Sequence, residues 1–151
     1  MSDASRTVVN HVGIGVTDLA RAQRFYTEVL GFEVDRVLHV PDTASGPFLG
    51  IDPPVNLTAV YLARDAFVLE LLHFDRPGNQ PAADRTFTQP GLTHLSFSVD
   101  DLPAALEQVV ALGGTVVTST GGQAAIVRDP DGQLLELMPM AYHERLVAER
   151  A

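Results

Sequence analysis

The chain has 151 residues, of which 46% are hydrophobic and 19% are charged, as in an ordinary soluble globular protein. No apolar run approaches the ~20 residues that a helix needs to span a membrane. The net charge is −9 and no basic residues cluster, which argues against a nucleic-acid partner. The sequence contains neither Cys nor Lys, so thiol nucleophiles, thiolate metal sites and Schiff-base lysines are excluded.

Any chemistry must therefore use His, Asp, Glu, hydroxyl groups, Arg, the backbone or a bound ion. The N-terminal segment MSDASRT has no basic stretch followed by an apolar one. We therefore find no secretory signal and expect a cytoplasmic protein. The length fits one compact domain or two small, mutually dependent halves.

In chain order, hydrophobic periodicity predicts that the first half forms a strand, a helix and three more strands. Asp18 is the predicted N-cap of the helix, which a glycine closes. These elements fall near residues 8–16, 18–30, 32–40, 56–63 and 66–74. The proline-rich stretch 41–54 is predicted to be a loop, and the proline- and glycine-containing stretch 75–91 to be a linker.

The second half repeats this order, with Asp101 as the predicted N-cap of its helix. Its elements fall near residues 92–99, 101–112, 115–119, 123–128 and 133–138. A last helix is predicted near 140–150 from its Ala, Glu, Arg and Leu content.

The two halves also share sequence. NHVGIGVTDL at 10–19 matches THLSFSVDDL at 93–102, so that His11 corresponds to His94. DAFVLEL at 65–71 likewise matches DGQLLEL at 131–137, so that Glu70 corresponds to Glu136. The repeat predicts an α+β fold of two tandem βαβββ modules, 8–74 and 92–139, within a single domain of residues 1–151. The linker 75–91 joins the modules, and the helix 140–151 follows them.

Strand alternation predicts the direction of the repeated side chains. In the first strand, large apolar residues such as Ile14 and Val16 share one face, while His11 shares the other with Gly13 and Gly15. The strand 92–99 has the same pattern, with two serines beside His94. A core histidine would have large apolar neighbours, so small neighbours indicate the wall of a cleft.

A lone carboxylate inside an apolar strand is costly to bury unless it is paired or binds a metal. For a single Glu, a solvated edge strand is an equally good explanation. Two His and two Glu at matching positions are better explained as ligands. If each sheet curls toward the other, His11, Glu70, His94 and Glu136 converge on one divalent ion, such as Ni, Zn, Co, Fe or Mn.

The motifs NHVGIGVTDL, RFYTEVLGF at 24–32, VLELLHF at 68–74, GLTHLSFSVDDL at 91–102 and DPDGQLLEL at 129–137 resemble the vicinal-oxygen-chelate superfamily. This group includes glyoxalase I, methylmalonyl-CoA epimerase, extradiol dioxygenases and the bleomycin- and fosfomycin-resistance proteins. The resemblance implies a curved, cup-like mixed sheet with helices outside. It also implies a homodimer that binds a small-molecule substrate, and metal ligands at the four positions above.

The quartet of two His and two Glu is most similar to glyoxalase I and the epimerases. It implies a lyase or isomerase that moves an α-proton of a substrate chelated through two oxygens, with Glu70 or Glu136 as the base. The additional glutamate of the epimerases has no counterpart in PVNLTAVYL at 54–62. No basic cluster matches the carboxylates of glutathione either, so both reactions remain open.

Two other functions also remain open. An extradiol-type dioxygenase would use His11, His94 and Glu136 on Fe(II) and leave Glu70 without a role. A resistance protein that binds an antibiotic without a metal would have no need for the four ligands. The apolar residues Phe48 and Leu49 of the predicted loop 41–54 are expected either to cover the cup or to lie in a dimer interface.

Overall fold

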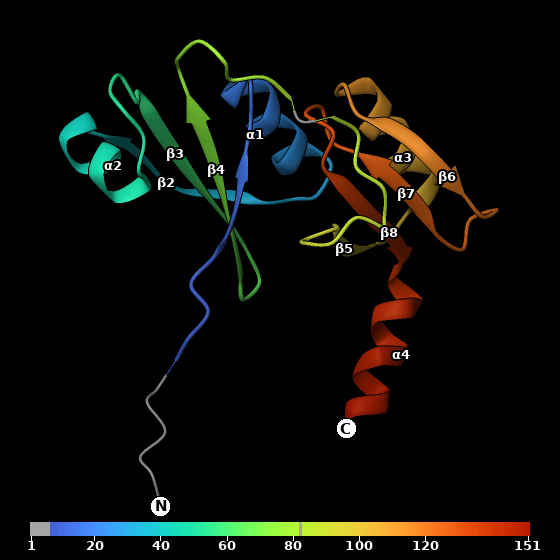
Figure 1. Ribbon diagram of the computed structural model, residues 1–151. Helices are drawn as coiled ribbons and strands as arrows, with labels where there is room; N and C mark the ends of the chain where they lie inside the picture. The colour runs from blue at the N-terminus through green and yellow to red at the C-terminus, as the bar shows by residue number, and fades with distance from the viewer. Residues whose placement is uncertain (1–6, 82) are drawn as a thin grey trace, which may run out of the picture.

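The computed structural model describes residues 7–81 and 83–151. Over these residues the chain forms two four-stranded sheets, which lie side by side in Figure 1. Residues 1–6, which carry most of the segment used to judge a secretory signal, lie outside the described residues. No helix among the described residues is both long and apolar enough to cross a membrane.

The first sheet and its helices come from the N-terminal half of the chain. Its elements are β1 (Val12–Gly15), α1 (Leu19–Glu28), β2 (Glu33–Val40), α2 (Asp42–Leu49), β3 (Leu57–Arg64) and β4 (Phe67–Phe74). The strand order is β1-β4-β3-β2, with β1 parallel to β4 and the other pairs antiparallel. The strand β1 therefore forms one edge of the sheet.

The second sheet repeats this arrangement. Its elements are β5 (His94–Val99), α3 (Leu102–Ala111), β6 (Thr115–Ser119), β7 (Ala125–Arg128) and β8 (Leu134–Pro139), followed by α4 (Met140–Arg150). The order is β5-β8-β7-β6, again with one parallel pair at the edge. The predicted α+β fold of two βαβββ modules with mixed sheets is confirmed.

Local sequence explains how the first helix of each module begins. The side chain of Asp18 accepts a hydrogen bond from the backbone N–H of Arg21, and Asp101 accepts one from Ala104. An aspartate at the N-cap satisfies a backbone donor that the helix cannot, which explains why both helices start where the sequence predicts. The strand faces are also as predicted, because Ile14 and Val16 are buried and Gly15 is exposed.

The prediction of a loop over 41–54 is wrong for its first part, because Asp42–Leu49 form α2. Gly46 and Pro47 are poor helix formers, so local propensity argued against this helix. Its stability comes from the fold: the Asp42 carboxylate accepts hydrogen bonds from the backbone N–H groups of Val55 and Asn56. Gly50, with φ of 68°, then ends the helix.

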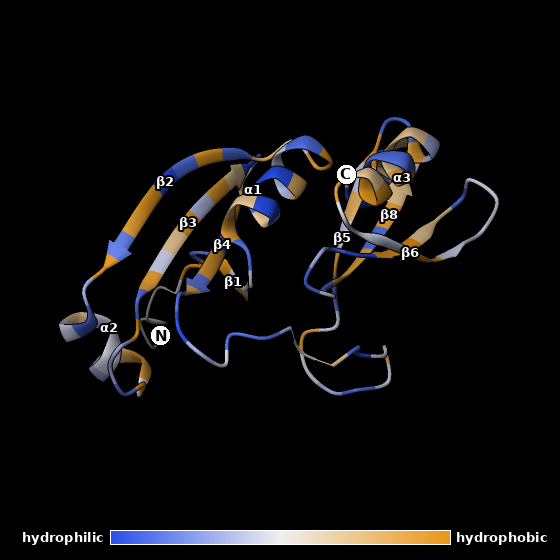
Figure 2. Cartoon of the chain, turned by 90° about the horizontal axis from the view of Figure 1, so that it is seen from above, coloured by the Kyte–Doolittle hydropathy of each residue, from blue (hydrophilic) through white to orange (hydrophobic). Residues whose placement is uncertain are grey.

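One hydrophobic core joins the two modules. Phe25 and Tyr26 of α1 belong to the same buried cluster as Val109 of α3 and Leu135 of β8. Figure 2 shows that α1 and α3 each have hydrophobic and hydrophilic sides, as expected for helices that cover a core. Neither module buries its apolar surface alone.

Polar contacts at this junction fix how the modules meet. The buried Tyr26 hydroxyl donates to Asp129 Oδ2 at 2.8 Å. Burial raises the pKa of Asp129, while the hydrogen bonds from Tyr26 and from the backbone N–H groups of Gln133 and Asp131 lower it. Nearby, Asp131 Oδ1 accepts from the backbone N–H and the hydroxyl of Thr17. These bonds hold the end of β1 against the turn between β7 and β8.

Candidate metal centre

His11 and Glu70 form the first pair of predicted ligands. His11 lies just before β1, and Glu70 lies in the middle of the neighbouring strand β4, opposite Gly13. His11 Nε2 is 3.0 Å from Glu70 Oε2, and the Glu70 side chain is only 12% exposed. A Cβ at Gly13 would make only ordinary van der Waals contact with Oε2, at 3.4 Å.

His94 and Glu136 form the second pair, on β5 and β8. Register places Ser96 opposite Glu136, and the Ser96 hydroxyl donates to Glu136 Oε2 at 2.6 Å. His94 Nε2 is 4.0 Å from the same oxygen, and both side chains are about one-third exposed. Thr93 Oγ1 lies 2.8 Å from His94 Nδ1, which leaves Nε2 as the ring nitrogen that faces Glu136.

The structure brings the predicted ligands together in pairs. Over residues 7–81 and 83–151, no group of three or more His, Asp or Glu side chains is close enough to hold one metal ion. One pair belongs to the first sheet and the other to the second, and each His lies at an edge strand, β1 or β5. A single chain thus carries two separate His–Glu pairs, each of which we call a half-site.

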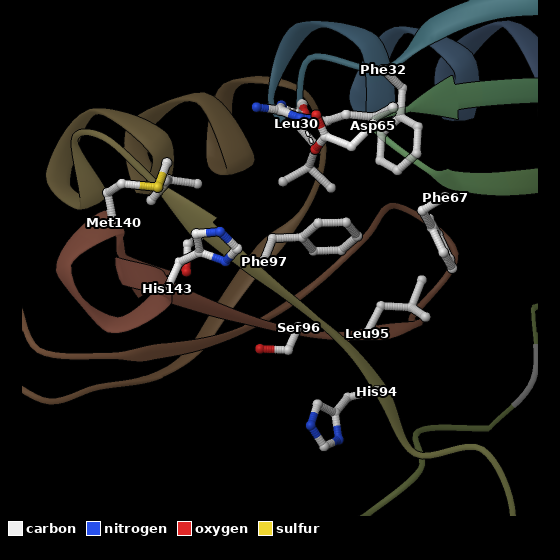
Figure 3. Close-up of a pocket in the computed structure, with 13 residues that line it drawn as sticks. Leu30, Phe32, Asp65, Phe67, His94, Leu95, Ser96, Phe97, Met140 and His143 are labelled. Atoms are coloured by element: carbon white, nitrogen blue, oxygen red, sulfur yellow. Dashed lines mark hydrogen bonds and ion pairs between the residues drawn. The ribbon is translucent and has the colours of Figure 1, made fainter. Parts of the chain in front are cut away.

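A cavity of about 500 Å³ runs along the β5 half-site. Its walls include Phe32, Phe67 and Phe97, together with Met140 and His143 at the start of α4. Figure 3 shows His94 and Ser96 on one side of β5 and Leu95 and Phe97 on the other, next to Phe67. A second cavity, of about 380 Å³, lies along β1. Both edge strands therefore border open space.

The donor atoms of the half-sites suit a divalent ion. Zinc–nitrogen and zinc–oxygen bonds are about 2.0–2.2 Å long and tetrahedral, so two donor atoms on one zinc ion lie about 3.4 Å apart. The His11–Glu70 separation of 3.0 Å and the His94–Glu136 separation of 4.0 Å lie on either side of this spacing. Two imidazoles and two carboxylates also form a donor set that such ions accept. The residues present therefore fit the predicted metal.

Sequence reasoning missed two neighbours of the candidate ligands, Tyr61 and Phe87, and the Arg36 side chain that packs on Tyr61. Tyr61 of β3 packs its ring edge-on against His11 with centroids 5.4 Å apart, and the Arg36 guanidinium lies 4.4 Å from the Tyr61 ring centroid. Phe87 of the linker packs against His94 at 5.1 Å. Alternation alone gives each residue a face, but these contacts depend on strand register and on the path of the linker.

Comparison with known proteins identifies a superfamily. A family model for the Glyoxalase/Bleomycin resistance protein/Dioxygenase superfamily matches residues 8–137. A lactoylglutathione lyase of Pseudomonas putida is 33% identical over 147 residues, covering 87% of this chain and 84% of that protein. A lactoylglutathione lyase of Arabidopsis thaliana is also 33% identical, over 85% of this chain. The chain spans less than half the length of this and two other plant relatives.

Solved structures share the architecture. A glyoxalase I of Leishmania major, described as trypanothione-dependent, superposes with a TM-score of 0.68 at 26% identity and covers 92% of this chain and 91% of its own. A fosfomycin resistance protein from Mesorhizobium loti, at 19% identity and a TM-score of 0.63 over 93% of this chain and 97% of its own, shows a shared fold only. The family match, the two βαβββ modules and the resemblance of the repeated motifs agree: the chain belongs to the glyoxalase, bleomycin resistance protein and dioxygenase superfamily.

Proposed function

We propose that this protein is a divalent-metal-dependent lyase or isomerase of the glyoxalase I or epimerase type. It would move an α-proton of a small substrate chelated through two neighbouring oxygens. The observation that carries the proposal is the His–Glu pair at matching positions of both modules, with donor atoms 3.0 and 4.0 Å apart. The relatives named lactoylglutathione lyase support the same class of reaction.

In this proposal His11, Glu70, His94 and Glu136 hold one ion, which acidifies the carbon-bound proton of the substrate that it chelates. The two glutamates differ in freedom. Glu70 is buried beside His11, whereas Glu136 is about one-third exposed and lies farther from its histidine. Glu136 is therefore the better base, because it has room to reach the substrate carbon and take up the proton.

A second copy of the chain would complete the site. Each half-site lies at an open edge of its own sheet. The hydrogen bond between Tyr26 and Asp129 fixes how the two modules of one chain meet, so the two half-sites of that chain stay apart. A homodimer that sets β1 of one copy beside β5 of the other would join both pairs. It would also cover the apolar walls of the cavity along β5, such as Phe67 and Phe97.

The test of this function is metal content followed by activity. Purified protein dialysed against buffer should retain about one equivalent of metal per complete site, and added Ni, Co or Zn should raise the melting temperature of stripped protein. The loaded protein should act on the hemithioacetal of methylglyoxal and glutathione or on methylmalonyl-CoA. Glu136→Gln should lower kcat by about 10²–10⁴-fold with metal still bound, because a general base contributes that much.

The alternatives give different results. Activity on catechols that requires Fe(II) and consumes oxygen would indicate an extradiol-type dioxygenase. Protein that binds no metal and gains no thermal stability from added ions would exclude the catalytic proposal and leave a metal-free binding protein. Full turnover by both Glu136→Gln and Glu70→Gln with metal bound would contradict proton transfer by either carboxylate.

A further inference from the structure

A row of side chains crosses the first sheet through Glu70. Strand pairing sets Arg36 of β2 opposite Tyr61 of β3, Tyr61 opposite Glu70 of β4, and Glu70 opposite Gly13 of β1. Residues directly opposite one another in a sheet project from the same face and touch. The row therefore places a phenol between a guanidinium and the carboxylate of a predicted ligand.

The corresponding row of the second sheet has different chemistry. There Thr118 lies opposite Ile126, Ile126 opposite Glu136, and Glu136 opposite Ser96. Ile126 thus takes the place of Tyr61, and Ser96 takes the place of Gly13. Each glutamate has a hydroxyl neighbour on one side only, and the side is reversed between the modules. The surroundings of Glu70 and Glu136 therefore differ, although the sequence repeat makes the two positions equivalent.

Tyr61 contacts both ligands of its half-site. A hydrogen bond with Glu70 is the main reason why the pKa of Tyr61 is raised, with burial and the charge of Glu70 acting in the same direction and Arg36 opposing them. Its ring meets the His11 ring edge-on at an interplanar angle of 90°. The Arg36 guanidinium lies over the ring, 4.4 Å from its centroid, in a cation–π contact. One side chain therefore constrains the carboxylate and the imidazole together.

This contact is separate from the hydrophobic core. The neighbours of Tyr61 along β3, Val60 and Leu62, are buried at 1% and 0% exposure, and they point to the opposite face of the sheet. Tyr61 itself is partly exposed on the face that carries Glu70. Removal of its hydroxyl should leave the packing of the core unchanged.

We propose that Tyr61 is a positioning residue: its hydroxyl donates to Glu70 and its ring supports His11, so that both are preformed as metal ligands. The assignment rests on the proposed function and deepens it. Partners that orient a metal ligand commonly contribute about 10–100-fold to metal affinity or activity. With Glu70 held in this way, the more exposed Glu136, whose histidine lies 4.0 Å away, is the carboxylate with more room to transfer a proton.

The test compares Tyr61→Phe with Tyr142→Phe, the same chemical change in α4. Metal affinity is measured by competition of Zn²⁺ or Co²⁺ between stripped protein and a chromophoric chelator. We expect Tyr61→Phe to raise the metal Kd by about 10-fold or more, with the melting temperature of metal-free protein unchanged. Tyr142→Phe should keep the wild-type Kd. Excess metal should restore most of the kcat of Tyr61→Phe, because the loss lies in ligand positioning.

A metal-free measurement separates this proposal from the proposed function. In stripped wild-type protein, the ring nitrogens of His11 should show a single tautomer by ¹⁵N NMR, because Glu70 is fixed 3.0 Å from Nε2. Tyr61→Phe should give an averaged signal, and Tyr142→Phe the wild-type one. If neither the wild type nor a variant binds metal but this NMR difference is seen, the positioning role of Tyr61 is supported and the proposed metal-dependent function is contradicted. An unchanged His11 signal in Tyr61→Phe, or a metal Kd within twofold of wild type, would overturn the role of Tyr61.

Discussion

At the scale of single residues, equivalent positions in the repeat have different surroundings. Glu70 has a histidine at 3.0 Å and Tyr61 beside it, whereas Glu136 accepts a hydrogen bond from Ser96 and has its histidine at 4.0 Å. The Glu136 side chain is also more exposed than that of Glu70, at 31% against 12%, so it can change position at a lower energetic cost. The structure thus supports different roles for two glutamates that the sequence alone cannot distinguish.

Tyr26 and Asp129 provide a test of the junction at the same scale. Tyr26→Phe removes a hydrogen bond to a buried carboxylate, so we expect it to lower the free energy of unfolding by about 1.5–3 kcal/mol near neutral pH. Urea unfolding of both proteins measures this difference. Tyr142→Phe is the matched control and should unfold like wild type.

The pH dependence of that difference has a predicted sign. Burial raises the pKa of Asp129 above its ordinary 3.8, so the ionisation of Asp129 disfavours the folded state as pH rises through the folded-state pKa. The Tyr26 hydroxyl stabilises the ionised form and limits this loss. The stability gap between wild type and Tyr26→Phe should therefore widen as pH rises above 3.8. A gap that is constant from acid to neutral pH would show that the bond does not depend on the charge of Asp129.

At the scale of secondary-structure elements, the glycines that follow α1 and α3 have different structural roles. Gly31 has φ of +67°, a conformation that residues with a side chain rarely adopt. Gly114 lies at the matching position of the repeated sequence, but its role is close packing. A Cβ on Gly114 would stand 2.6 Å from the Arg128 carbonyl oxygen and 2.9 Å from Phe25 Cε2. Here α1, α3 and β7 meet too closely for any side chain.

Gly114→Ala should therefore lower the free energy of unfolding by about 1–3 kcal/mol through overpacking, measured by thermal or urea unfolding. Gly15→Ala is a suitable control, because nothing stands within 4 Å of a Cβ at that position and its φ is not positive. The control should stay within about 0.5 kcal/mol of wild type. Equal stabilities for the two variants would mean that the junction yields to fit the extra methyl group.

At the scale of the whole molecule, one core joins two modules whose His–Glu pairs remain apart. If a second copy completes each site, Glu70 and Glu136 of one site come from different chains. Mixed and re-equilibrated Glu70→Gln and Glu136→Gln proteins should then form heterodimers in which one of the two sites has both glutamates intact.

Such a mixture should recover about a quarter of wild-type activity, since half of the dimers are mixed and each has one complete site. The measurement is the turnover of the mixture relative to each variant alone. A site built within one chain would give no gain on mixing, because every site would still lack one glutamate.

Much of this protein follows from its sequence. The repeat predicted two βαβββ modules, Asp18 and Asp101 predicted the helix starts, and strand alternation put His11 and His94 beside small residues. These features depend on local periodicity and capping, which a few neighbouring residues determine. The four candidate ligands were also named from the sequence, because lone carboxylates in apolar strands are conspicuous.

Only the tertiary structure decided the features that depend on distant residues. The helix α2 formed against local propensity because Asp42 binds the backbone of Val55 and Asn56. Register placed Tyr61 beside Glu70, and the buried bond between Tyr26 and Asp129 set one module against the other. Such contacts join residues far apart in the chain, and no periodic pattern encodes them. Because long-range packing decides which side chains meet, the sequence predicts four ligands around one ion, while the structure shows the four side chains as two separate pairs.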